Sequence, residues 1–105
     1  MKLDRVWKFG IELLDRQQII IPANFSVLSV GLDPAGDLCM WAAVDKDAET
    51  RTLEIIVVGT GEPMPPVGTF LGTVTQGLFV WHIFAGPGHD LVSANFNYQT
   101  AGNAP

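Results

Sequence analysis

The chain has 105 residues, enough for one small domain, and its 48% hydrophobic and 16% charged residues exclude a disordered polypeptide. Its net charge of −5, with every Lys and Arg at or before Arg51, argues against binding to duplex DNA or RNA, which requires a basic face.

The first part of the chain predicts β-strands. Val6–Leu13 alternates apolar with polar or small residues, which is typical of a strand with one buried face. That face would carry Trp7, Phe9, Ile11 and Leu13. Ile19–Ile21 is a short β-branched run that Pro22 ends, as expected of an edge strand.

A hairpin is predicted next. Phe25–Leu32 is followed by the turn Asp33–Asp37, in which Pro and Gly stand where a tight turn favours them. Leu38–Val44 returns as a strand that is apolar on both faces, with Cys39, Trp41 and Ala43 on one of them. Such a strand is expected at the centre of a sheet or at an interface.

The second half predicts three more strands. After a polar turn, Thr50–Val58 is a strand whose last residues are apolar on both faces. Gly59–Gly68 is rich in Gly and Pro and predicts the longest irregular connection. Thr69–Gln76 and Leu78–Ala85 then form a hairpin that turns at Gln76-Gly77.

Together these elements predict an all-β, mainly antiparallel fold, a small sandwich or barrel of six to seven strands. We expect residues 1–85 to form a single β domain and residues 86–105 a C-terminal extension that is flexible or crosses to a neighbouring subunit. In a strand with two apolar faces, the face that does not contact the core must be buried against another surface. We therefore also expect a homo-oligomer, in which a second subunit buries it. Met1 is not followed by an apolar signal-peptide core, and no apolar run approaches the roughly 20 residues of a membrane span, which predicts a cytoplasmic protein without a membrane partner.

Catalytic and metal-binding patterns are missing from the sequence. The single Cys39 permits neither an internal disulfide nor a cysteine-based zinc site, and His82 and His89 lack zinc-ligand spacing. No serine stands in a nucleophile-elbow sequence. We therefore expect no enzyme activity, no metal and no cofactor.

Ligand binding is the chemistry for which the chain carries suitable residues. Trp41 and Trp81 could stack on a planar ligand, and Arg51 could contact a phosphate or carboxylate in bidentate fashion. Gly59-Thr60-Gly61-Glu62 could form a ligand-contacting rim, although it lacks the Lys and the helix of a phosphate-binding loop. His82 could contact the same ligand. Each of these residues also has a structural alternative. The two tryptophans could pack in the core, Arg51 could be a surface cation, Gly59–Glu62 could be a structural loop, and His82 could be a half-buried, hydrogen-bonded histidine.

Three sequence blocks, in this order, resemble a family of small uncharacterised proteins encoded by phages and prophages. They are Leu38–Asp45, Gly59–Pro65 and Phe70–Thr73 leading to Val80–Phe84, and Val6–Phe9 fits as well. The resemblance covers roughly residues 5–85. It implies a phage accessory protein in the host cell cytoplasm but no established activity.

In that setting we expect a non-enzymatic protein that sequesters a small ligand, such as a nucleotide immune signal, to counter host defence. The ligand-binding residues would be Trp41, Arg51, Thr60, Glu62, Trp81 and His82. The alternatives are a protein-binding inhibitor of a host defence protein and a structural or assembly accessory protein.

Overall fold

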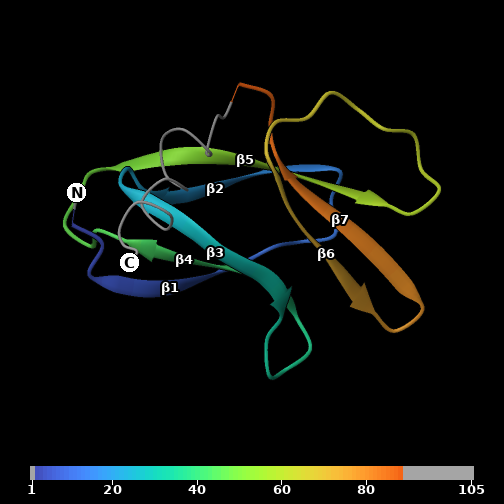
Figure 1. Ribbon diagram of the computed structural model, residues 1–105, viewed down its shortest axis with the longest axis horizontal. Coiled ribbons are helices and arrows are strands. Elements are labelled where there is room, and N and C mark those ends of the chain that lie inside the picture. The colour runs from blue at the N-terminus through green and yellow to red at the C-terminus, as the bar shows by residue number, and fades with distance from the viewer. Residues whose placement is uncertain (1, 89–105) are drawn as a thin grey trace.

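The computed structural model describes residues 2–88, which form seven β-strands and no helix (Figure 1). They are β1 (Arg5–Gly10), β2 (Arg16–Pro22), β3 (Phe25–Leu32), β4 (Leu38–Val44), β5 (Thr50–Gly59), β6 (Phe70–Gln76) and β7 (Phe79–Ala85). All pairs are antiparallel, in a three-stranded sheet of order β1-β4-β3 and a four-stranded sheet of order β2-β5-β7-β6. The predicted all-β fold is confirmed, and its architecture is a small sandwich.

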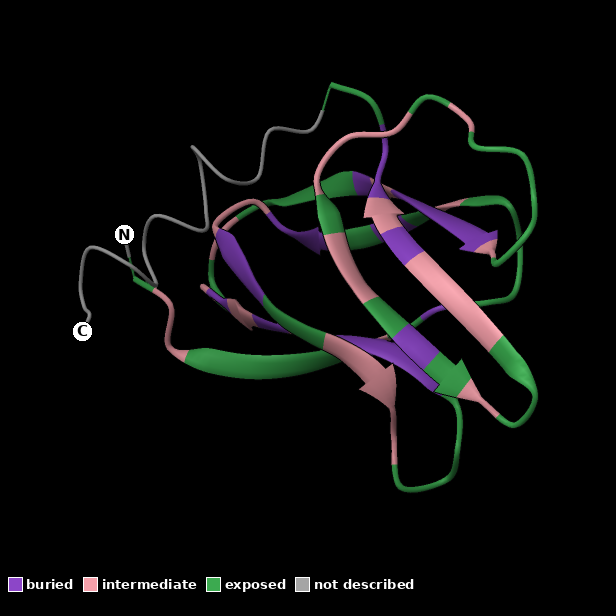
Figure 2. Ribbon diagram, turned by 45° about the vertical axis from the view of Figure 1, so that its right-hand side comes forward, coloured by how far each residue is buried: buried purple, intermediate pink, exposed green. Residues whose placement is uncertain are grey.

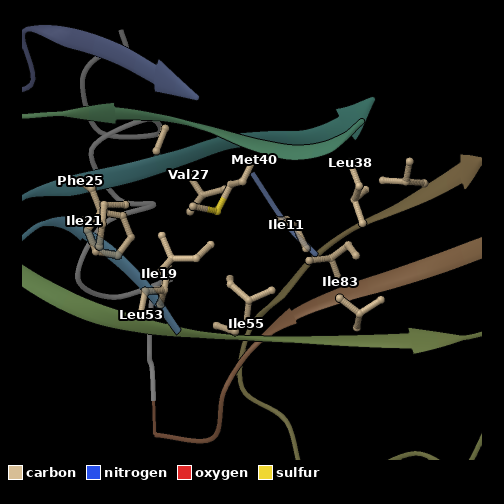
Figure 3. Packing of buried hydrophobic residues seen from close by; sticks show 14 of the residues in the cluster. Ile11, Ile19, Ile21, Phe25, Val27, Leu38, Met40, Leu53, Ile55 and Ile83 are labelled. Atoms are coloured by element: carbon tan, nitrogen blue, oxygen red, sulfur yellow. The ribbon is translucent and has the colours of Figure 1, made fainter. Parts of the chain in front are cut away.

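The hydrophobic core lies between the two sheets (Figure 3). Met40 and Ala42 of β4 and Leu53 and Ile55 of β5 are fully buried there. They alternate with residues that point away from the core, as the period-2 pattern predicts. The other core members are Ile11, Ile19, Ile21, Phe25, Val27, Leu38, Val44, Val57, Val74, Ile83 and Ala85.

Several pairings agree with the sequence analysis. β3 and β4 form the expected hairpin, and β4 lies at the centre of its sheet. β2 is an edge strand that ends at Pro22. β6 and β7 form the last hairpin, in which Gly77 has a φ of 61°, a conformation that a two-residue turn requires and glycine adopts without strain.

The first strand differs from its prediction. β1 ends at Gly10 rather than Leu13, and Leu13 lies exposed in the connection to β2, which belongs to the other sheet. Only Ile11 of the expected buried face is buried, while Trp7 is 40% exposed and Phe9 is half-buried. The cause is the edge position of β1, which pairs with β4 alone and is exposed along most of its length (Figure 2).

The outer face of the four-stranded sheet is partly covered by the chain itself. β5 and β6 run in the same direction with β7 between them, so residues 60–69 must cross back from the end of β5 to the start of β6. Pro63, Met64 and Pro65 of this connection line a cavity of about 340 Å³ together with Ile56 and Val58. Both β5 residues are buried, as expected for a strand that is apolar on both faces.

The two sheets approach closely where β3 lies beside β6. Gly72 of β6 has a φ of 153° and packs so tightly on Val30 of β3 that a Cβ added at Gly72 would lie 2.6 Å from Cγ2 of Val30. The Gln76 side-chain amide also donates a hydrogen bond of 3.2 Å to the Gly36 carbonyl in the β3–β4 turn. These contacts fix the last hairpin to the three-stranded sheet.

The predicted C-terminal extension falls mostly on residues 89–105, which lie outside the described residues. Between residues 2 and 88 there is no helix that could span a membrane.

Candidate functional site

A groove of about 450 Å³ lies beside the turn of the last hairpin, where β5 ends. We call it the hairpin groove. It is lined by Gly59, Thr60, Glu62, Leu78, Phe79, Val80 and Trp81. Three of the residues proposed from the sequence, Thr60, Glu62 and Trp81, therefore share one surface.

The groove exists because β7 continues beyond the last residue of β5. Gly59 is the last β5 residue with a partner on β7, and it pairs with Trp81. The chain then turns at Thr60, whose N–H donates a hydrogen bond of 3.1 Å to the Val80 carbonyl, and the Glu62 N–H donates one to the Gly59 carbonyl. The tight turn holds Glu62 over the end of β5, opposite the aromatic residues of the hairpin.

His82 supports the groove without lining it. Its Nε2 lies 2.8 Å from the Thr60 hydroxyl and its Nδ1 lies 3.0 Å from the Thr73 hydroxyl. The imidazole is half-buried on the outer face of the sheet, and both of its nitrogens have hydrogen-bond partners. This geometry corresponds to the half-buried, hydrogen-bonded histidine that the sequence left as an alternative, and it fixes Thr60 at the rim of the groove.

Trp81 provides an aromatic wall. Its ring stacks on Phe79 with a centroid distance of 5.5 Å and an interplanar angle of 14°. The indole N–H donates a hydrogen bond of 3.0 Å to Oε1 of Gln76, the residue that also contacts Gly36. The ring is thus held in one orientation, half-buried against the core.

Glu62 and Trp81 meet above Gly59. A Cβ added at Gly59 would lie 3.3 Å from Cζ3 of Trp81 and 3.6 Å from both Cγ and Cδ of Glu62. The missing side chain of Gly59 therefore lets the carboxylate and the indole flank the same point. No described Lys, Arg or His lies within ion-pair distance of the Glu62 carboxylate, and the neighbouring Arg16 pairs with Glu54 at 3.0 Å.

The sequence analysis missed three residues that line this surface, Leu78, Phe79 and Val80, and the first two are the most exposed. Leu78 is 98% exposed in the turn between β6 and β7, and Phe79, the first residue of β7, is 62% exposed. A polar residue is usual in a two-residue turn, so Gly77-Leu78-Phe79 is an exception that the sequence alone could have revealed.

Trp41 and Arg51 lie away from the groove. Trp41 is half-buried on the β4 face that points away from the core, in the other sheet. Arg51 lies near the start of β5, eight residues before Gly59 and roughly 26 Å from it at the rise of a β-strand. Its guanidinium lies over the Phe25 ring, 5.7 Å from the centroid. The six candidate residues thus do not form one pocket within the described chain.

The described residues hold no cluster of three or more His, Cys, Asp or Glu side chains that could bind a metal ion. Cys39 is buried, and this burial raises the pKa of its thiol above the ordinary value. A thiol in this environment is a poor nucleophile.

Residues 3–91 match the model of a family described as a domain of unknown function, DUF7352. Searches of curated proteins and of solved structures found no match.

Proposed function

Because the chain belongs to the DUF7352 family, a domain of unknown function, we propose its function from the hairpin groove. We propose a non-enzymatic binding protein that docks on a protein partner through the end of the β6–β7 hairpin. The observation that carries this proposal is the exposure of Leu78 and Phe79 at the end of a well-anchored hairpin.

The energetics favour a protein partner. A large apolar side chain gains about 1.5–3 kcal/mol when it leaves water, and Leu78 gains almost none of this within its own subunit. Interface hot spots combine such anchors with aromatic residues that are already ordered, which lowers the entropic cost of binding. Phe79 and Trp81 meet this description, since their rings stack and Trp81 is hydrogen-bonded to Gln76.

The resemblance to phage and prophage proteins gives the proposal a biological setting. In that setting the partner is a host defence protein that this chain inhibits by occupying its surface. A homo-oligomer would present several hairpins at once and raise the avidity for such a partner.

Docking is tested by comparing the wild type with Leu78→Ser and Phe79→Ser. Tagged proteins are expressed in the source cells, a protein retained by the wild type is identified and purified, and its affinity is measured by calorimetry. We expect each substitution to raise Kd at least about tenfold, the effect of losing a hot-spot side chain. Leu28→Ser, at an exposed leucine of β3, is the matched control and should bind like the wild type. Equal affinities for all four proteins would overturn the proposal.

Sequestration of a nucleotide is the second candidate, because the exposed Phe79–Trp81 stack could also hold a planar base. Glu62 disfavours it, since a carboxylate in the groove repels phosphate and Arg51 is too distant to offset that charge. A thermal-shift screen against cyclic and other signalling nucleotides tests it. A ligand at 100 times its Kd stabilises by about 2.7 kcal/mol. A shift of that size, lost in Trp81→Leu, would favour sequestration over docking.

A further inference from the structure

The hairpin groove carries a negative charge. Among residues 2–88, Glu62 is the only ionisable residue that lines it, and no Lys or Arg follows Arg51 in the sequence. The whole chain carries a net charge of −5, so neither the groove nor the background field favours an anion. A ligand group with a positive charge complements this surface.

The groove also has the geometry of a cation site. The Glu62 carboxylate and the Trp81 ring approach the same point above Gly59, and Phe79 extends the aromatic surface. A cation in the groove beside these side chains would gain an ion pair with Glu62 and a contact with the aromatic surface at the same time. Arginine suits this pair best, because its flat guanidinium stacks on an aromatic ring and presents two N–H groups to a carboxylate.

We infer that the hairpin groove binds an arginine side chain of the protein partner, with the guanidinium paired to the Glu62 carboxylate beside the aromatic surface of Phe79 and Trp81. This inference rests on the proposed docking function, since Leu78 and Phe79 bring the partner to the groove. The Thr60 hydroxyl, held by His82, lies at the rim and is a further polar contact for the guanidinium. An apolar residue next to that arginine would contact Leu78.

The inference is tested without the partner by titrating the full ¹⁵N-labelled chain with N-acetyl-arginine amide. The Trp81 indole N–H and the Gly59 amide are followed by NMR. We expect saturable shifts of both resonances and about tenfold weaker binding in Glu62→Gln, which keeps the size of the side chain but removes its charge. Glu49→Gln, an exposed acid at the opposite end of β5, is the control and should bind like the wild type. N-acetyl-citrulline amide, the uncharged isostere, should leave the indole resonance unchanged.

Two results would overturn the inference: equal shifts from citrulline and arginine, or unchanged binding in Glu62→Gln. The partner then separates this failure from failure of the docking proposal. If Leu78→Ser weakens the complex and Glu62→Gln does not, the docking proposal is supported and the arginine site is contradicted. If Glu62→Gln abolishes arginine binding while Leu78→Ser leaves the complex intact, the cation site is supported and docking through the hairpin is contradicted.

Discussion

Gly72→Ala should destabilise the sandwich at the contact between its two sheets. The new methyl group would lie 2.6 Å from Cγ2 of Val30, where carbon atoms in contact are normally separated by more than 3.4 Å. Overpacking of this kind costs about 1–3 kcal/mol. The φ of 153° adds about 1–3 kcal/mol, because alanine rarely adopts it. We therefore expect a loss of about 2–6 kcal/mol, a large part of the 5–15 kcal/mol typical of a domain.

Urea unfolding, monitored by tryptophan fluorescence, measures this loss. Gly10→Ala is the matched control, because a Cβ there meets no atom within 4 Å, and its stability should stay within about 0.5 kcal/mol of the wild type. In a double-mutant cycle, Val30→Ala should recover the overpacking part but not the backbone part. A Gly72→Ala protein as stable as the control would refute the close approach of β3 and β6.

Three further predictions concern the core, pH and assembly. Ile55→Ala should cost about 2–5 kcal/mol in urea unfolding because it leaves a cavity between the sheets, whereas Leu78→Ala should change stability by less than about 0.5 kcal/mol; similar losses would contradict the assigned core. The hydrogen bond from Lys8 lowers the pKa of Asp33 in the folded protein. The ionised Asp33 therefore contributes its full stabilisation of the fold above the ordinary pKa of 3.8, and this contribution is lost as the pH falls through the lower pKa of the folded protein. Urea unfolding at pH 7, 5 and 3 should show this fall, reduced in Asp33→Asn, and stability that rises toward pH 3 would contradict it. Light scattering at micromolar concentration should give at least twice the chain mass of 11.4 kDa, and a monomer would exclude the predicted homo-oligomer.

The local elements of this fold could be predicted from the sequence because their causes are local. In Thr50–Val58, for example, Thr52 and Glu54 alternate with Leu53 and Ile55, a local pattern that predicts a strand. Likewise, the Asp33–Asp37 and Gln76-Gly77 turns determine which strands are hairpin neighbours, since a short turn leaves the chain no other geometry.

Only the tertiary structure decided how far each predicted face is buried. Trp7 follows the same alternation as the core residues, yet it is exposed because β1 is at a sheet edge. Edge or central position depends on pairing between distant segments, such as β1 with β4, and no short sequence window contains that information.

The candidate site shows the same division. Thr60, Glu62 and Trp81 could be chosen as candidate binding residues from their chemistry, but Arg51 is separated from them by the length of β5. The position of Glu62 and Trp81 on either side of Gly59 depends on Gly59 pairing with β7, a register set by the whole four-stranded sheet. The sequence alone thus determines the chemistry of each side chain. Strand order and register determine which side chains become its neighbours, because pairing between strands brings together residues that are far apart in the chain.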